Sequence, residues 1–137
     1  YPLFETVLYI SSLLTSSLLF GGMLFFSASF AAFLLKSLPP AMARTLIREA
    51  FPSFYLFVII TSLIAALLAL KSSLLSASIL VLITLSTIPT RQILMPAINA
   101  ATDAKLKQRF LMLHGLSVVI TLAHVIAVGF VIIDLAS

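Results

Sequence analysis

The sequence predicts an all-α, polytopic integral membrane protein: a bundle of four transmembrane helices. Of its 137 residues, 62% are apolar and only 9% are charged, whereas a soluble domain is about 45–50% apolar and about 25% charged. The mean hydropathy of +1.26 also indicates lipid as the solvent. Because one span needs about 20 residues, a single membrane domain, residues 1–137, has room for four spans and their connections.

The first span is predicted at about residues 5–35, the uncharged run between Glu5 and Lys36. This run is longer than a perpendicular helix needs, so we expect the helix to tilt or to project from the hydrocarbon. Pro40 and its neighbouring proline should stop it, because proline lacks an N–H and disfavours the α conformation in the preceding residue.

The second and third spans are predicted at 51–70 and 74–90. Pro52 suits the first turn of the second span, where a helix needs no backbone donor. Lys71 ends that span, and Pro89 closes the third.

The fourth span is predicted at 110–133, bounded by Arg109 and Asp134. This assignment leaves two basic connections, residues 36–50 and 91–109. Seven of the eight Lys and Arg residues fall in these two connections, and only Lys71 lies elsewhere.

This charge distribution predicts the topology. Connections rich in Lys and Arg remain on the cytoplasmic side, so both termini should lie on the outer side of the membrane. A bacterial cytoplasmic membrane or a mitochondrial inner membrane fits this arrangement. The net charge of +4 is then a property of topology, and no nucleic-acid partner is expected.

The two basic connections are amphipathic, which indicates short helices lying at the headgroups. We expect membrane lipids as partners, with anionic headgroups at the inner face. The predicted headgroup contacts are Arg44, Arg48, Lys105, Lys107 and Arg109.

Span four carries a polar seam within an arc of about 80° at 100° per residue; its members are His114, Ser117, Thr121 and His124. One interpretation is hydrogen bonding between helices. The other is a path for protons or a ligand, because ionisable groups inside a membrane are costly and commonly functional.

No enzymatic activity and no metal site are predicted. His114 and His124 lie about 15 Å apart along one helix, too far apart to ligate one ion together, and the chain has no cysteine. No carboxylate is positioned to orient His114 as a base for Ser117. No cofactor is predicted, and haem or copper, held with a methionine or by a second subunit, remains an alternative.

Small residues on the first span predict a helix-packing face, because they let backbones approach closely. Its members are Ser11, Thr15, Gly22 and Ser29. The second span offers a similar face, formed by Ser62, Ala65, Ala66 and Ala69.

Several short motifs carry a resemblance to a known family: Gly22-x-x-x-Phe26, Leu38-Pro39, Ala50-Phe51-Pro52-x-x-Tyr55, Arg91 with Met95-Pro96, and Leu113-His114-Gly115-x-Ser117. Together they resemble the transmembrane protein 205-like family, whose members are four-helix membrane proteins with a domain of unknown function. The resemblance implies four spans but supplies no reaction. This chain departs from the family pattern at Thr121, where an Asn is usual, and at Pro40, where a basic residue is common.

These observations favour a non-catalytic membrane protein, an accessory or assembly subunit of a larger membrane complex that docks through its long first span. A small oligomeric transporter or channel for protons, metal or a small solute is the alternative. A haem- or copper-binding redox protein is the third.

Overall fold

The computed structural model describes residues 2–137, and Tyr1, the first residue of the predicted domain, lies outside them. The elements in chain order are α1 (Pro2–Leu24), η1 (Phe25–Phe30), α2 (Ala31–Ser37), α3 (Pro40–Ala69), α4 (Leu74–Pro89), η2 (Thr90–Leu94), α5 (Met95–Asp103) and α6 (Lys107–Ala136). The π-helical turns η1 and η2 join their neighbours into continuous rods. Four rods result, each long and apolar enough to cross a membrane. The all-α prediction of four helices is confirmed, and their composition indicates an integral membrane protein.

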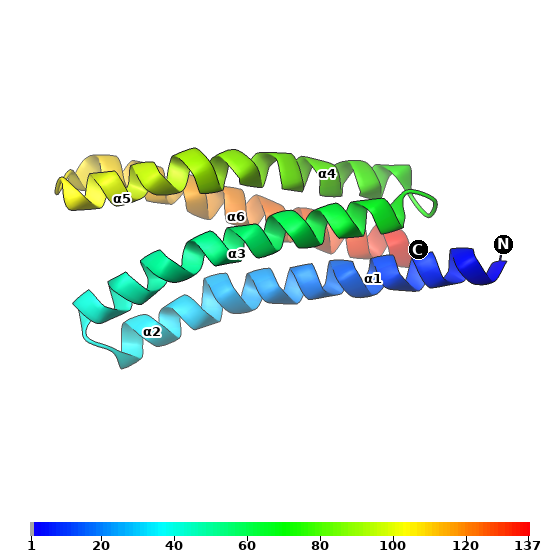
Figure 1. Cartoon of the computed structure of the whole chain (residues 1–137), viewed down its shortest axis with the longest axis horizontal. Coiled ribbons are helices and arrows are strands. Elements are labelled where there is room, and N and C mark those ends of the chain that lie inside the picture. The colour runs from blue at the N-terminus through cyan, green and yellow to red at the C-terminus, as the bar shows by residue number, and fades with distance from the viewer. Residues whose placement is uncertain (1) are drawn as a thin grey trace.

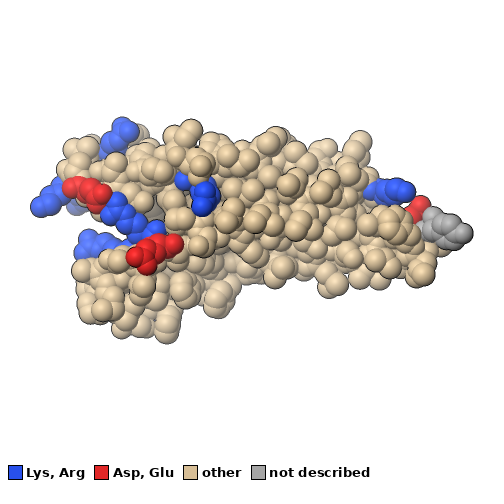
Figure 2. Space-filling model, in the orientation of Figure 1, with Lys and Arg blue, Asp and Glu red and all other residues tan. Residues whose placement is uncertain are grey.

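The rods lie side by side as an elongated bundle (Figure 1). The two termini and the α3–α4 turn lie at one end, where they line a common pocket. The α2–α3 and α5–α6 turns lie at the other end, and there α3 and α5 diverge. Lys and Arg side chains gather at this second end (Figure 2), which we call the basic end.

The connection expected at residues 36–50 is much shorter than predicted. The chain leaves the helical conformation only at Leu38 and Pro39, whose ψ angles of 156° and 144° are extended. Pro40 then begins α3, where a missing N–H costs nothing. Residues 41–49 are therefore the first turns of a long helix, and a separate helix lying at the headgroups is not observed.

Pro52 was expected at a helix start but lies inside α3. A proline there removes one helical hydrogen bond without ending the helix when neighbouring elements support the backbone. The acceptor that loses its partner is the Arg48 carbonyl, four residues back. Arg91, from η2, donates its Nε–H to the Pro52 carbonyl at 3.0 Å, and this bond joins η2 to α3 beside the proline.

The connection expected at 91–109 is also mostly helical. Pro89 does not end the third rod, because the chain continues through η2 and α5 to Asp103. In η2 the Met95 N–H bonds the Thr90 carbonyl five residues back, which accommodates one extra residue in the helix.

The third rod ends in a Schellman turn. The Leu106 N–H bonds the Ala101 carbonyl at 2.9 Å, and the Lys105 N–H bonds the Thr102 carbonyl at 3.1 Å. This turn requires a left-handed residue, usually glycine. Lys105 holds that position with a φ of 57°.

The α3–α4 contact is the most extensive between any two elements. The predicted small face of α3 forms it, and Ser62, Ala65, Ala66 and Ala69 are all buried. The hydroxyls of Ser62 and Thr84 share a buried hydrogen bond of 2.6 Å across this interface. Close backbone approach and one polar pair therefore join these helices, as is usual within membranes.

Aromatic rings join α3 to the first rod near the basic end. Phe26 of η1 stacks on Phe54, with ring centroids 4.3 Å apart, and meets Phe51 edge-on at 5.0 Å. This contact anchors η1 against the segment of α3 that leads to the basic end.

At the opposite end, Asp134 of α6 holds the start of α4. Its Oδ2 accepts hydrogen bonds from Ser73 Oγ at 2.5 Å and Ser76 Oγ at 2.6 Å. Ser73 also caps α4 by accepting the Ser76 N–H at 3.1 Å. A carboxylate at a helix N-terminus is favoured by the helix dipole, so this contact fixes α6 against α4.

Candidate functional site

A cleft of about 710 Å³ opens between α3, α5 and α6 at the basic end. Ligand sites commonly enclose about 300–1,000 Å³. The walls of this cleft are largely apolar. They include Phe51 from α3, Met95 and Ile98 from α5, Leu106 just before α6, and Phe110 in α6. We call this space the basic-end cleft.

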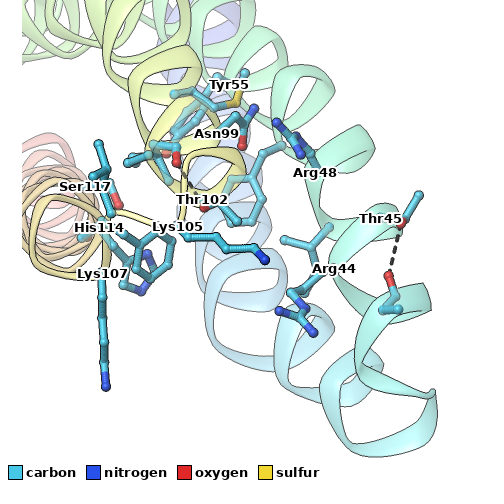
Figure 3. Close-up of a pocket in the computed structure, with 18 residues that line it drawn as sticks. Arg44, Thr45, Arg48, Tyr55, Asn99, Thr102, Lys105, Lys107, His114 and Ser117 are labelled. Atoms are coloured by element: carbon cyan, nitrogen blue, oxygen red, sulfur yellow. Dashed lines mark hydrogen bonds between the residues drawn. The ribbon is translucent and has the colours of Figure 1, made fainter.

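Cations surround the mouth of the cleft, and they come from three parts of the chain. Arg44 and Arg48 lie on α3, Lys105 on the α5–α6 turn, and Lys107 at the start of α6. Figure 3 shows the Lys105 side chain extending toward Arg44, while Lys107 points away from both. Four of the five predicted headgroup contacts therefore line one cavity, and Arg109 is exposed outside it.

One of these cations is already paired with a carboxylate. Arg48 forms a bidentate ion pair with Asp103, with Nη1 and Nη2 at 2.9 and 2.7 Å from the two carboxylate oxygens. The pair spans α3 and the end of α5. Among residues 2–137, no carboxylate pairs with Arg44 or Lys105.

Polar groups occupy the inner part of the cleft. Tyr55, His114 and Ser117 line it there. The His114 ring is exposed and stacks on Phe110, with centroids 5.4 Å apart. Ser117 is buried and donates its hydroxyl to the His114 carbonyl at 2.7 Å.

The predicted polar seam continues beyond the cleft. Thr121 lies beside the hydroxyl of Tyr55, and His124 Nε2 is 2.8 Å from Ser86 Oγ of α4. The four seam residues thus meet three different environments: the open cleft for His114 and Ser117, α3 for Thr121, and α4 for His124. The Ser86–His124 hydrogen bond joins α4 to α6. A role of the whole seam, in packing or as a path, stays a prediction.

The predicted packing face of α1 is only partly covered within this chain. Ser11, Thr15 and Gly22 are half-buried, and Ser29 is exposed. Gly22 makes the closest contact, because a Cβ there would lie 2.7 Å from the Phe57 ring. The stripe of α1 that the bundle buries is the adjacent one, formed by Ser12, Ser16, Leu19 and Met23. Docking of another protein on the predicted face stays a prediction.

No group of three or more His, Cys, Asp or Glu side chains that could hold a metal gathers within residues 2–137.

The cleft itself was missed by the sequence reasoning, although both long walls carry a readable pattern. On α3 the positions Arg44, Arg48, Phe51 and Tyr55 follow helical spacing and form one stripe. On α6 a matching stripe runs through Lys107, Phe110, His114 and Ser117. Each stripe changes from basic to aromatic to hydroxyl-bearing along the helix, which is the order in which the cleft presents these groups.

A family model described as Domain of unknown function (DUF4149) matches residues 14–107. The chain belongs to the DUF4149 family. The match includes the cleft walls contributed by α3 and α5 and ends at Lys107, so the α6 wall beyond Lys107 lies outside it. The match does not name the transmembrane protein 205-like family. No curated protein and no solved structure matches this DUF4149 chain.

Proposed function

We propose that this DUF4149 protein is a non-catalytic membrane protein that binds an amphipathic anion in the basic-end cleft. One observation carries the proposal: the cleft is apolar along its walls and cationic at its mouth. Such a site matches a molecule with an anionic head and an apolar chain, because the head can meet Arg and Lys while the chain covers aromatic and aliphatic surface.

The chemistry of the lining supports binding over catalysis. Its 18 residues include one histidine but no carboxylate and no cysteine. His114 therefore has no acidic partner within the cleft to orient it as a general base, and Ser117 donates its hydroxyl to a backbone carbonyl. A nucleophile activated by a base, itself oriented by a third group, is not assembled there.

The binding test uses the purified, delipidated protein in a neutral detergent. We expect phosphatidylglycerol to be retained in native mass spectrometry more strongly than phosphatidylcholine with the same chains. Arg44→Gln combined with Lys105→Gln should remove this preference. Lys36→Gln combined with Lys71→Gln deletes the same charge outside the cleft and should leave it intact. Equal retention of both lipids by the unmodified protein would refute the proposal.

The setting of this function follows from the charge distribution. In our proposal the basic end faces the cytoplasm or the mitochondrial matrix, both termini face outward, and the binding role serves a larger membrane complex as an accessory subunit. The transmembrane protein 205-like assignment belongs to the same proposal, because its motifs from Gly22 to Pro96 fall within the matched region. Native mass spectrometry of the complex in mild detergent tests the subunit role, which a lone monomer would contradict.

A transport function is the second candidate, and a specific arrangement favours it. Polar groups continue from the cleft past Tyr55 and Thr121 to the Ser86–His124 hydrogen bond. A proton or small solute that enters the cleft would find hydrogen-bonding groups farther along α6. Proton flux in liposomes that His124→Leu abolishes would support this candidate, and the absence of flux from the unmodified protein would oppose it.

A further inference from the structure

The basic-end cleft holds two cations that face each other without an acidic partner. Arg44 comes from α3 and Lys105 from the α5–α6 turn, and Figure 3 shows the Lys105 side chain extending toward Arg44. Arg44 donates its Nε–H to the Pro40 carbonyl of its own helix at 3.2 Å, which leaves its two Nη groups for a ligand. No carboxylate within residues 2–137 pairs with either. Like charges close to one another repel. An anion bound between Arg44 and Lys105 would therefore stabilise this arrangement of the two side chains.

The other cations of the mouth are differently disposed. Arg48 is held in the bidentate pair with Asp103, and Lys107 points away from Arg44 and Lys105 (Figure 3). A ligand that neutralises both Arg44 and Lys105 therefore needs about two negative charges. A phosphomonoester supplies about −1.5 to −2 charge at neutral pH and three acceptor oxygens. An arginine fork can bind two of these oxygens while a lysine binds the third as a point charge.

Neutral donors near the mouth are mostly committed elsewhere. Thr45 donates its hydroxyl to the Ala41 carbonyl at 3.0 Å, and Thr102 donates to the Ile98 carbonyl at 3.0 Å. Both bonds stay within their own helices, so these threonines can still accept hydrogen bonds but have no free donor for an anion. Asn99 also lines the cleft and carries a neutral amide donor. The strongest donors at the mouth are nevertheless the charged ones, Arg44 and Lys105, and these favour a doubly charged phosphate.

The backbone at Lys105 adds an independent observation. Its φ of 57° lies in the left-handed region, at the one position of the Schellman turn that glycine normally fills. A lysine there is strained relative to glycine. In return, this position aims an ammonium group across the cleft, and strain of this kind clusters at ligand sites.

The apolar walls indicate whether the phosphate is a free ion or part of a lipid. Phe51, Ile98 and Phe110 line the same space as the cations, and a free phosphate ion would leave them uncovered. We infer that the basic-end cleft binds the phosphomonoester head of a lipid, with the phosphate between Arg44 and Lys105 and the first part of its chains along Phe51, Ile98 and Phe110. This inference rests on the proposed function, binding of an amphipathic anion, and specifies the class of that anion.

The test compares four probes on the purified protein in neutral detergent: phosphatidic acid, phosphatidylglycerol and phosphatidylcholine with identical chains, and inorganic phosphate. We expect phosphatidic acid to bind about tenfold tighter than phosphatidylglycerol, which bears a single negative charge, since a charge-assisted bond is lost with the diester. Arg44→Gln and Lys105→Gln should each remove this advantage, and Lys36→Gln should not.

A second variant separates binding from folding. Lys105→Gly relieves the left-handed strain, so it should raise the thermal stability of the lipid-free protein while it removes the advantage of phosphatidic acid. A variant that binds poorly because it is misfolded would instead lose stability.

Each other outcome is decisive. Equal binding of both anionic lipids, each above phosphatidylcholine, would overturn the phosphomonoester inference and leave the proposed function standing. Equal binding of all three lipids would overturn both. Binding of inorganic phosphate as tight as that of phosphatidic acid would assign the site to a soluble phosphate and overturn the lipid inference. An advantage of phosphatidic acid that survives in the Arg44→Gln and Lys105→Gln variants would place the phosphate elsewhere.

Discussion

Arg48 and Asp103 form a two-point ion pair, at 2.9 and 2.7 Å, that joins α3 to the end of α5 at the mouth of the basic-end cleft. Both side chains are substantially exposed, at 43% and 63%. Exposed pairs contribute little to stability. The more important consequence is that Asp103 occupies a guanidinium that an anionic ligand could otherwise use.

Replacement of Asp103 therefore tests the competition between carboxylate and ligand. Asp103→Asn frees Arg48, so we expect anionic lipid to bind several-fold more tightly, with little change in the midpoint of thermal unfolding. Glu49→Gln, which removes an exposed carboxylate that does not line the cleft, is the matched control and should have no such effect. Weaker lipid binding by Asp103→Asn would show that the ion pair shapes the site.

Two adjacent glycines of α1 provide a test of packing. A Cβ on Gly22 would lie 2.7 and 2.8 Å from two atoms of the Phe57 ring, whereas a Cβ on Gly21 would meet nothing within 4 Å. We expect Gly22→Ala to lower the free energy of unfolding by about 1–3 kcal/mol, the usual cost of overpacking. Gly21→Ala should cause no loss. Equilibrium unfolding in mixed detergent measures both, and equal stabilities would contradict the packing of α1 on α3.

The Ser86–His124 hydrogen bond, at 2.8 Å, allows the structural interpretation of the polar seam to be tested by measuring how much the bond stabilises the bundle. Hydrogen bonds between membrane helices contribute about 0.6 kcal/mol on average and up to about 1.7 kcal/mol. A double-mutant cycle with Ser86→Ala and His124→Leu should give a coupling energy in this range. Retention of phosphatidic acid should be unchanged in all three variants, because neither residue lines the cleft. A coupling energy of zero would remove the bond as a source of stability.

The sequence predicted the features that depend on composition and on the helical period. Apolar runs located four helices, and small residues at helical spacing located the buried face of α3 at Ser62 and Ala65. Such patterns are local and repeat within one element. They could not reveal where two elements far apart in the chain converge.

The errors arose where a local stop signal is overridden by distant contacts. Pro52 and Pro89 both lie inside rods that they were expected to begin or end. A proline inside a helix removes one hydrogen bond, and packing of a long rod against its neighbours can offset that loss. The η2 turn is a change in helical register that the sequence does not mark. Lys105 was predicted as a headgroup contact, but its left-handed turn was not, because such a turn is normally recognised by its glycine. The cleft could not be predicted without these two features. Its walls lie in the parts of the helices that extend past the prolines, and its turn carries Lys105.

The orientation of the bundle is the last prediction, and the chain is well suited to test it because it has no cysteine. Ser37, in the last turn of α2 near the basic end, and Ser72, at the α3–α4 turn, are both exposed. The positive-inside rule places Ser72 outside and Ser37 inside. In intact cells a membrane-impermeant maleimide should therefore label Ser72→Cys, and it should label Ser37→Cys only after permeabilisation. Ser78→Cys, exposed on the apolar surface of α4, is the matched control and should resist the reagent in both conditions because lipid covers it. Labelling of Ser37→Cys alone in intact cells would reverse the topology and place the basic-end cleft, with any lipid that it binds, at the outer leaflet.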